Sequence, residues 1–394
     1  MKDRVILHCD LNNFFASVSL LSNATLYNLP VAVCGSVEER HGIVLAKNEI
    51  AKKYGVKTAE AVWEAKAKCK DLVILAPDYK KYKEYSIKAR KIYERYTDLI
   101  EPFGIDECWL DVTDSTFLFG SGEEIANKIR NAVKRELGIT ISVGVSFNKI
   151  FAKLGSDMKK PDAVTVISRE NFKDKVWNLP AEDLLFVGKS TAEKLRANGI
   201  FTVGDITRCD TAVLERLLGK NGQTLKMSAL GEDNSPVTPI SDDDKPKSVG
   251  RSVTPNHDIT TPDEVWRIFL SLAEDISRQL RNKGLYACGI QLHTRNTALK
   301  VKETAHTFSV PVNSAMMLAK KAMELFKSVY KWDIPLRSVG FRAINLKDGR
   351  SAVQQDIFGD TEVAKKQEDI ENSIQTVREK FGFESLKRGR IIND

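Results

Sequence analysis

Cysteine is scarce in this sequence, and the cysteines present are scattered. The 394 residues include six cysteines, and no two of them form a Cys-x-x-Cys pair. This pattern argues against a zinc site and against a disulfide framework, and it favours a reducing compartment. We therefore expect a cytoplasmic protein.

Long hydrophobic runs are also missing. No stretch of about 18 apolar residues occurs, so no membrane span is expected. The first residues, MKDRVILHCDLNN, hold only a short apolar run that ends at Asp10. That run is too short and too polar for a secretory signal. The sequence therefore predicts neither a membrane partner nor secretion.

Positive charge is present in excess, and it is unevenly distributed. The formal net charge is +7. Residues 248–348 contain 15 Lys and Arg residues against nine Asp and Glu residues, an excess of six. A basic excess concentrated in about a quarter of the chain favours binding of a polyanion. A solvated basic surface without a ligand remains the alternative.

The first 165 residues alternate predicted strands and helices without a strict strand-helix-strand repeat. This order favours an α+β fold in which helices cover one face of a sheet. Residues 166–232 are predicted to form short helices. Within them, a Val187-Gly188 turn before a helix resembles a helix-hairpin-helix, whose backbone N–H groups hold a DNA phosphate. Ordinary helix packing accounts for the same residues equally well.

The rest of the chain reads as a linker, a second domain and a tail. Residues 233–247, DNSPVTPISDDDKPK, contain three prolines and are predicted to be a linker. Four predicted strands and two helical stretches follow, so residues 248–348 should form a small α/β sheet domain. Residues 349–394 are predicted to be a charged, mostly helical tail.

An acidic pair stands inside an otherwise apolar stretch at residues 103–111, FGIDECWLD, which is predicted to form a hairpin. Asp106 and Glu107 are adjacent there, and burying an isolated charge is expensive. Together with Asp10, which ends an apolar run near the N-terminus, they could hold two hard divalent cations such as Mg²⁺. Two such ions stabilise the attacking and leaving oxygens of phosphoryl transfer. A solvated acidic pair is the commoner alternative.

Five segments occur in the order found in Y-family translesion DNA polymerases: HCDLNNFFASVSL, VLAKNEIAKKYGVKTAE, GIDECWLDVT, SVGVSFNKIFAKLGSDMKKPD and SVGRSVTP. The chain resembles this family over residues 4–347, and it is most similar to the bacterial DNA polymerase IV and UmuC-like groups. The resemblance implies a template-directed DNA polymerase for lesion bypass that adds dNTPs to a primer 3′-OH by two-metal phosphoryl transfer. It also implies low fidelity, and no stretch resembles a proofreading exonuclease.

The resemblance further implies a multidomain right-hand polymerase with a C-terminal little-finger domain. The implied division is palm at 1–24 and 78–165, fingers at 25–77, thumb at 166–232, linker at 233–247, little finger at 248–348 and tail at 349–394. Primer-template DNA and dNTP are the implied partners, and a monomer is expected.

Site residues are carried over from the family by position. The metal ligands for two Mg²⁺ ions would be Asp10, the Leu11 carbonyl, Asp106 and Glu107, with Asp106 and Glu107 catalytic. The nucleotide contacts would be Phe14, Phe15, Lys52 and Lys160, with Phe15 as the steric gate that excludes a ribose 2′-OH. The DNA contacts would be Gly188, Lys189, Arg251 and Arg342.

Two positions depart from the family pattern. Gly104 replaces a serine that many members have before the acidic pair, and this removes no metal ligand. Glu49 stands where many members have a tyrosine that touches the triphosphate. Because a carboxylate would repel phosphate, we expect the Glu49 side chain to point away.

The tail contains QQDIF at residues 354–358. Gln354, Ile357 and Phe358 match the Q-x-x-[L/I]-F pattern by which bacterial polymerases bind the replicative sliding clamp. The alternative is a short apolar turn that anchors the tail. Two other functions remain open from the residues: a metal-dependent nucleotidyl cyclase or nuclease on a similar palm, and a non-catalytic DNA- or clamp-binding scaffold.

Overall fold

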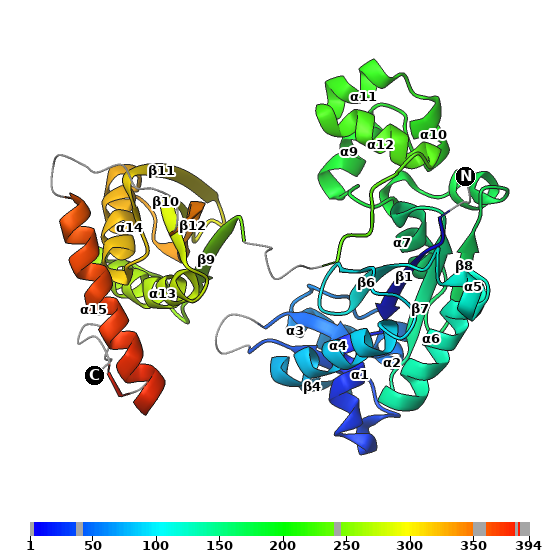
Figure 1. Cartoon of the computed structure of the whole chain (residues 1–394), viewed down its shortest axis with the longest axis horizontal. Helices are drawn as coiled ribbons and strands as arrows, with labels where there is room; N and C mark the ends of the chain where they lie inside the picture. The colour runs from blue at the N-terminus through cyan, green and yellow to red at the C-terminus, as the bar shows by residue number, and fades with distance from the viewer. Residues whose placement is uncertain (1–3, 37–41, 240–245, 350–359, 383–384, 387–394) are drawn as a thin grey trace. The chain divides into compact units, whose positions relative to one another are not determined.

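The computed structural model describes residues 4–36, 42–239, 246–349, 360–382 and 385–386. These residues divide into two compact units, one ending at residue 239 and the other beginning at residue 246 (Figure 1). Among the described helices, none has the length and apolar character needed to span a membrane.

A five-stranded sheet, in the order β5-β6-β1-β7-β8, lies at the centre of the first unit. Its strands pair antiparallel except for the parallel pair β7–β8. The strands are β1 Ile6–Leu11, β5 Ile100–Pro102, β6 Glu107–Asp111, β7 Ile141–Ser146 and β8 Val164–Ile167. Because β1 is flanked by β6 on one side and β7 on the other, its backbone position is determined from both sides.

Helices cover both faces of this sheet, so the prediction of helices on one face is wrong. Helices α4 (Tyr79–Tyr93) and α6 (Gly122–Leu137) share an apolar core with one face, whereas α7 (Lys149–Met158) packs on the other. Every residue of β1 and β7 is buried. Since successive strand residues point to opposite faces, both faces of the central strands need a cover.

The acidic pair lies at the start of β6 and not in the middle of a hairpin strand. The chain turns between β5 and β6 through residues 103–106. The predicted hairpin is therefore confirmed, with Asp111 on the returning strand, but its first strand ends at Pro102 and lies before residues 103–111. The Phe103 N–H donates to the Glu107 carbonyl oxygen at 2.9 Å and closes this turn. A four-residue reversal leaves no room for an extended first strand in FGID.

A smaller three-stranded sheet, in the order β3-β2-β4, also belongs to the first unit and has its own apolar core. The elements of this region are α1 Phe14–Leu21, η1 Ala24–Leu26, β2 Val31–Cys34, β3 Val44–Lys47, α2 Glu49–Lys53, α3 Val62–Lys68 and β4 Val73–Leu75. The Asn48 side chain caps α2 by accepting from the Ala51 N–H. This cap determines that α2 begins directly after β3.

Residues 166–232 are helical after β8, as predicted. The elements are α8 Phe172–Val176, η2 Ala181–Asp183, α9 Lys189–Ala197, α10 Val203–Arg208, α11 Thr211–Leu218 and α12 Lys220–Leu230, and a short helix α5 at Thr116–Phe119 lies earlier in the chain. Their apolar side chains share a core with Phe147 and Phe151 at the start of α7. The helical region is therefore packed directly onto the helix that covers the central sheet.

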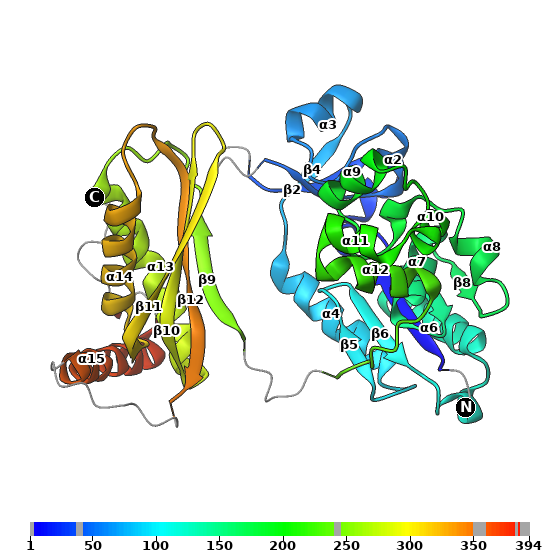
Figure 2. The ribbon, with the colours of Figure 1, turned by 90° about the horizontal axis from the view of Figure 1, so that it is seen from above.

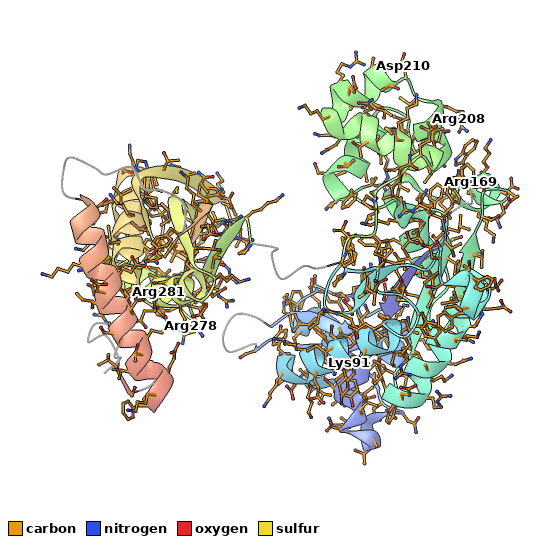
Figure 3. All side chains as sticks on the ribbon, viewed as in Figure 1. Lys91, Arg169, Arg208, Asp210, Arg278 and Arg281 are labelled. Atoms are coloured by element: carbon orange, nitrogen blue, oxygen red, sulfur yellow. The ribbon has the colours of Figure 1, made fainter. Side chains whose placement is uncertain are left out.

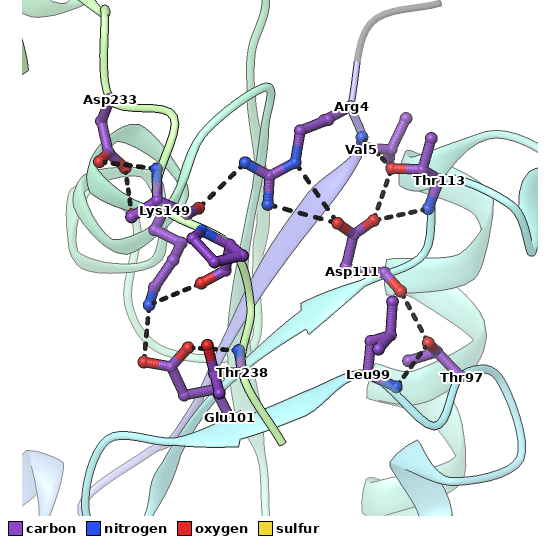
Figure 4. Close-up of polar contacts among 12 residues, drawn as sticks. Arg4, Val5, Thr97, Leu99, Glu101, Asp111, Thr113, Lys149, Asp233 and Thr238 are labelled. Carbon is purple, nitrogen blue, oxygen red and sulfur yellow. Dashed lines mark hydrogen bonds and ion pairs between the residues drawn. The ribbon is translucent and has the colours of Figure 1, made fainter. Parts of the chain in front are cut away.

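The first part of the predicted linker is bound to the central sheet (Figure 4). Arg4 Nη1 donates to the Ser235 carbonyl oxygen at 3.0 Å, and the Thr238 N–H donates to Glu101 Oε2 at 2.8 Å. Lys149 Nζ holds the other oxygen of Glu101 at 2.6 Å, and Val237 is buried. Since its polar groups find partners on the first unit, this part of the chain does not behave as a free spacer.

The second unit is a four-stranded antiparallel sheet, in the order β11-β10-β12-β9, with two helices packed on one face (Figure 2). Its elements are β9 Ser248–Val253, α13 Pro262–Asn282, β10 Leu285–Asn296, β11 Val301–Val312, α14 Ala315–Val329 and β12 Leu336–Asp348. Buried rings of Phe269, Phe326 and Phe341 join both helices to the sheet. The opposite face of the sheet carries no helix of this unit among the described residues.

Helix α15 (Asp360–Phe381) packs against the helical side of the second unit. Arg281 Nε donates to Gln375 Oε1 at 2.9 Å, and Arg378 Nη2 lies 3.2 Å from Glu274 Oε1. Figure 3 labels Arg281 on α13 beside α15. The described part of the predicted tail is therefore helical and belongs structurally to the second unit.

We expect Gly144→Ala to destabilise the first unit. A Cβ atom at Gly144 would overlap the Ala152 carbonyl oxygen of α7, and backbone cannot yield as a flexible side chain does. The expected loss is about 1–3 kcal/mol in the free energy of unfolding, measured by urea unfolding. Gly188→Ala is the control, because a Cβ atom there meets nothing within 4 Å. Equal stability of the two variants would contradict the packing described here.

Candidate functional site

The register of β1 against β6 brings acidic side chains from distant parts of the chain together. Asp10 lies directly opposite Glu107 in the antiparallel ladder. The Leu11 N–H donates to the Asp106 carbonyl oxygen at 3.1 Å, so Asp106, the residue before Glu107, lies beside Leu11 at the same end of the ladder. The Asp10 side chain is nearly buried, with 5% of the residue exposed. The predicted metal ligands thus gather at one end of the β1–β6 pair.

Two lysines from the α7 region form ion pairs with Asp10 and Glu107. Lys153 Nζ lies 3.3 Å from Asp10 Oδ2 and 3.0 Å from Glu107 Oε1. Lys160 Nζ lies 2.7 Å from Asp10 Oδ2. Although burial lowers the pKa of Lys153, the surrounding carboxylates raise it above its ordinary value, so its ammonium stays charged.

Sequence reasoning missed Lys153. The available signal was its place on α7, where it follows buried Phe151 and Ala152 and precedes buried Leu154. A lysine among such neighbours is seldom buried without a partner. The position of Lys153 in the sequence did not identify Asp10 and Glu107 as its partners, because these two residues lie on strands that are far from α7 in the chain.

A buried histidine stands behind Glu107. His8 is fully buried on β1, its Nδ1 lies 2.8 Å from Ser156 Oγ, and its Nε2 lies 3.4 Å from Glu107 Oε2. Burial lowers the pKa of His8. Burial alone would raise the pKa of Glu107, but the His8 ring and the Lys153 ammonium lower it to about 2. Glu107 therefore remains ionised under all ordinary conditions.

The other two carboxyl groups are less well compensated. Burial raises the pKa of Asp10, and the lysines offset this only in part. Burial, with the charges of Asp10 and Glu107, raises the pKa of Asp106 to about 6. The site therefore holds more negative charge than its own lysines neutralise. As the side chains stand, the described residues include no group of three or more His, Cys, Asp or Glu residues arranged to hold a metal ion.

The two phenylalanines that follow β1 occupy different surroundings. The Phe15 ring stacks on Tyr82, with ring centres 4.2 Å apart and planes at 9°. Tyr79 packs edge-on against the same ring at 5.8 Å. Phe14 is 3% exposed and belongs to the apolar core. The structure therefore holds the Phe15 ring in one orientation and places Phe14 where little of its ring is accessible.

The Glu49 side chain points toward the turn that follows β1. Its Oε1 accepts a hydrogen bond from Asn13 Nδ2 at 2.9 Å and lies 3.7 Å from Lys52 Nζ. Asn13, at the turn after β1, offers this donor within reach of the first residue of α2. The expectation that Glu49 points away from the triphosphate stays a prediction. Lys52 thus has a carboxylate beside it, whereas Lys160 is engaged with Asp10.

The predicted DNA contacts lie in both units. Gly188 is the residue before α9 and Lys189 is its first residue, as a helix N-terminal phosphate contact requires. Arg251 on β9 and Arg342 on β12 line a surface hollow of about 400 Å³ on the second unit, together with Glu303. Arg251 Nε also holds Asp275 at 2.6 Å.

Gln354, Ile357 and Phe358, the predicted clamp-binding residues, lie outside the described residues.

Comparisons with known proteins agree across the whole chain. Residues 9–157 match the impB/mucB/samB family, and residues 246–357 match the impB/mucB/samB family C-terminal domain. The chain is 47% identical to DNA polymerase IV of Acetivibrio thermocellus, over 99% of this chain and 98% of that protein. It is 36% identical to DNA polymerase IV 1 of Bacillus subtilis, over 99% of this chain and 94% of that protein.

A solved structure is also similar. A Y-family DNA polymerase chimera superposes with a TM-score of 0.78 and 23% sequence identity, covering 87% of this chain and 99% of that one. At this level of identity the likeness supports the fold alone.

The raised pKa of Asp106 predicts a stability that changes with pH. Its folded-state value of about 6 lies above the ordinary 3.8, so the ionised group destabilises the folded chain at neutral pH. That loss disappears as pH falls to about 3, below both pKa values, where the carboxyl is protonated in both states. Without metal ions, Asp106→Asn should therefore be more stable than wild type by about 1–2 kcal/mol near pH 7 and equal to it near pH 3.

Urea unfolding in the presence of a chelator, at both pH values, measures this difference. Glu107→Gln is the matched control, because the pKa of Glu107 is lowered to about 2. Its ionised form stabilises the folded chain above its unfolded-state pKa, so this variant should lose stability near pH 7. Destabilisation of both variants near pH 7 would show that Asp106 is not the uncompensated charge.

Proposed function

The chain belongs to the Y-family DNA polymerases of the DNA polymerase IV type, and we propose that its reaction takes place at Asp10, Asp106 and Glu107. The family matches confirm the predicted fold class and activity: the enzyme is a translesion DNA polymerase that extends a primer on a DNA template with dNTPs. Divalent metal use and low fidelity are general features of this family. The cross-strand pairing of Asp10 with Glu107 is the observation that carries the site assignment.

The carboxylates suit a hard divalent cation. Their oxygens are the ligands that Mg²⁺ prefers, and Mg²⁺ usually retains positions for substrate phosphates. A positive charge already bridges Asp10 and Glu107 in the form of the Lys153 ammonium. The raised pKa of Asp106 indicates that more positive charge would be accommodated. We propose two Mg²⁺ ions held by Asp10, the Leu11 carbonyl, Asp106 and Glu107.

The carboxylates and lysines of the site have separate roles in this reaction. Bound Mg²⁺ would supply the charge that stabilises the attacking primer oxygen and the departing pyrophosphate. Asp10 on β1 and Asp106 in the turn before β6 would hold that charge in place, and Glu107 stays ionised through His8 and Lys153. Lys52 and Lys160 act as point charges on the triphosphate, which requires Lys160 to exchange Asp10 for phosphate.

Sugar selection is assigned to Phe15. Its ring is stacked on Tyr82 and supported by Tyr79, so it cannot easily turn aside for a bulkier sugar. A rigid ring next to C2′ of the incoming nucleotide would exclude a 2′-OH by overlap. The buried Phe14 ring supports the region from the core side and contributes packing more than contact with the nucleotide.

We assign the parts of the right hand as the family resemblance implies. The central sheet with α4, α6 and α7 is the palm, the small sheet the fingers, residues 166–232 the thumb and the second unit the little finger. Exposed Arg342 on the open sheet face and exposed Arg251 on the edge strand β9, where it pairs with Asp275 of α13, suit duplex phosphates, with Gly188 and Lys189 as a second contact in the thumb. The chain would act as a monomer, and binding should weaken steeply with salt.

The triad predicts a separation of catalysis from DNA binding. Asp106→Ala or Glu107→Ala should slow nucleotide addition by about 10³-fold or more through lost transition-state stabilisation. Affinity for primer-template should change little, because Lys and Arg elsewhere contact the phosphates. Primer extension and fluorescence anisotropy on the same preparations test this, with Glu123→Ala on the exposed start of α6 as control. Near wild-type extension by both variants would exclude these residues as the catalytic site.

Sugar choice provides a second test. Phe15→Ala should raise the ratio of rNTP to dNTP incorporation efficiency by about tenfold or more, with dNTP use largely retained. Single-nucleotide extension with each nucleotide measures the ratio. Phe14→Ala serves as the comparison, since its buried ring should affect stability more than sugar choice. An unchanged ratio in Phe15→Ala would move the gate to another residue.

The clamp-binding motif provides the third test. If Ile357 and Phe358 fill a pocket on the sliding clamp and Gln354 bonds at its rim, a few anchors should dominate the contact. The double variant Ile357→Ala, Phe358→Ala should leave extension without clamp unaltered and should lose the processivity gained from a loaded clamp. A lower melting temperature together with lower clamp-independent activity would instead show that these side chains anchor the tail on the enzyme itself.

A further inference from the structure

Lys153 occupies an unusual position among the charged groups of the palm. Its side chain is only 12% exposed, and its single ammonium contacts three carboxylates. Two of them, Asp10 and Glu107, belong to the catalytic strands, at 3.3 and 3.0 Å. The third, Asp157, follows one turn later on the same helix, with Oδ2 at 3.1 Å. The lysine therefore connects the catalytic carboxylates to a carboxylate outside them.

The backbone of α7 determines this placement. The Asn148 side chain caps the helix by accepting from the Phe151 N–H. Gly144 of β7 lets the helix backbone approach the sheet closely at Ala152. Ser156 Oγ donates to the Lys153 carbonyl oxygen at 2.7 Å and also contacts His8, so the helix turn that carries Lys153 is tied to β1. The Lys153 side chain can change its conformation, but its backbone is held beside the carboxylates.

Asp157 differs from the two catalytic carboxylates in its surroundings. Its side chain is 46% exposed, so it remains hydrated and can hold an ammonium without a large desolvation cost. Lys160 Nζ also lies 2.9 Å from Asp157 Oδ1. A divalent cation and the Lys153 ammonium cannot both lie between Asp10 and Glu107, because two like charges in one partly buried site repel strongly.

We propose that Lys153 is the resident counter-ion of the catalytic carboxylates in the metal-free enzyme, and that Asp157 holds its ammonium when a divalent cation enters. The inference rests on the metal site proposed above. Lys153 then competes with the cation for Asp10 and Glu107, and Asp157 favours the cation by offering the displaced ammonium another partner. Lys153 and Asp157 are positioning residues in this scheme, since they act through the carboxylates.

The test is calorimetric titration of the full chain with Mn²⁺, without DNA or nucleotide. A pH of about 8 keeps the Asp106 carboxyl ionised, since its pKa is raised to about 6. Lys153→Met should lower the Mn²⁺ dissociation constant roughly five- to tenfold, as expected when a competing charge is removed. Asp157→Asn should raise the dissociation constant. Because Asp157 is exposed, this variant should fold even if Lys153→Met does not.

Two further variants separate this scheme from a general change of charge. Lys149→Met removes the same charge one turn earlier on α7, where the ammonium pairs with Glu101 at 2.6 Å, and it should leave Mn²⁺ affinity unchanged. In the double variant Lys153→Met, Asp157→Asn, the effect of Asp157→Asn should vanish if Asp157 acts only through Lys153. Melting temperatures should show Lys153→Met destabilised without Mn²⁺ and restored by saturating Mn²⁺.

The possible results distinguish the proposed metal site from the counter-ion role of Lys153. Wild-type chain that binds no Mn²⁺ would overturn the proposed metal site itself. Wild-type binding with equal affinity in Lys153→Met would overturn the counter-ion role and leave the metal site standing. An Asp157→Asn effect that persists in full in the double variant, or an equal gain of affinity in Lys149→Met, would reduce the effect to bulk charge and would also overturn the proposal.

Discussion

The antiparallel register of β1 with β6 is the constraint on which the catalytic unit depends. Side chains alternate between the two faces of a strand, so a slip of one residue would move Asp10 to the opposite face, where Cys9 now lies. β7 pairs with β1 on its other edge and prevents that slip. The close contact between Gly144 of β7 and the backbone of Ala152 then fixes the distance of α7 from the sheet face that carries Asp10. Carboxylates from two strands and a lysine from a helix consequently meet at one point.

This meeting point is electrostatically unfavourable without added positive charge. Burial and mutual repulsion raise the pKa values of Asp10 and Asp106, whereas Glu107 alone is stabilised in its ionised form by His8 and Lys153. A folded chain tolerates such a cluster because the apolar cores of the first unit supply stability elsewhere. The arrangement is what a site for divalent cations requires, and it illustrates stability exchanged for function.

The second unit is organised on a different principle. Its two helices and sheet form one continuous apolar core, and α15 adds ion pairs and hydrogen bonds along α13. Its uncovered sheet face presents Arg342, whose Nη2 lies 3.8 Å from Glu303 Oε1. The residues proposed to be catalytic lie in the first unit, whereas the basic excess lies in the second. The first residues of the segment that follows the first unit are bound to that unit.

The sequence by itself determined the family, the order of the elements, the basic second domain and the acidic residues that belong together, because motif order and local periodicity are properties of the chain. It did not determine the turn at residues 103–106, the cover on both sheet faces, the direction of Glu49 or the role of Lys153. Each of these depends on which residue lies opposite another across a sheet or a helix contact. Lys153, Asp10 and Glu107 are far apart in the chain, and only the register of β1 and the height of α7 place one ammonium between two carboxylates.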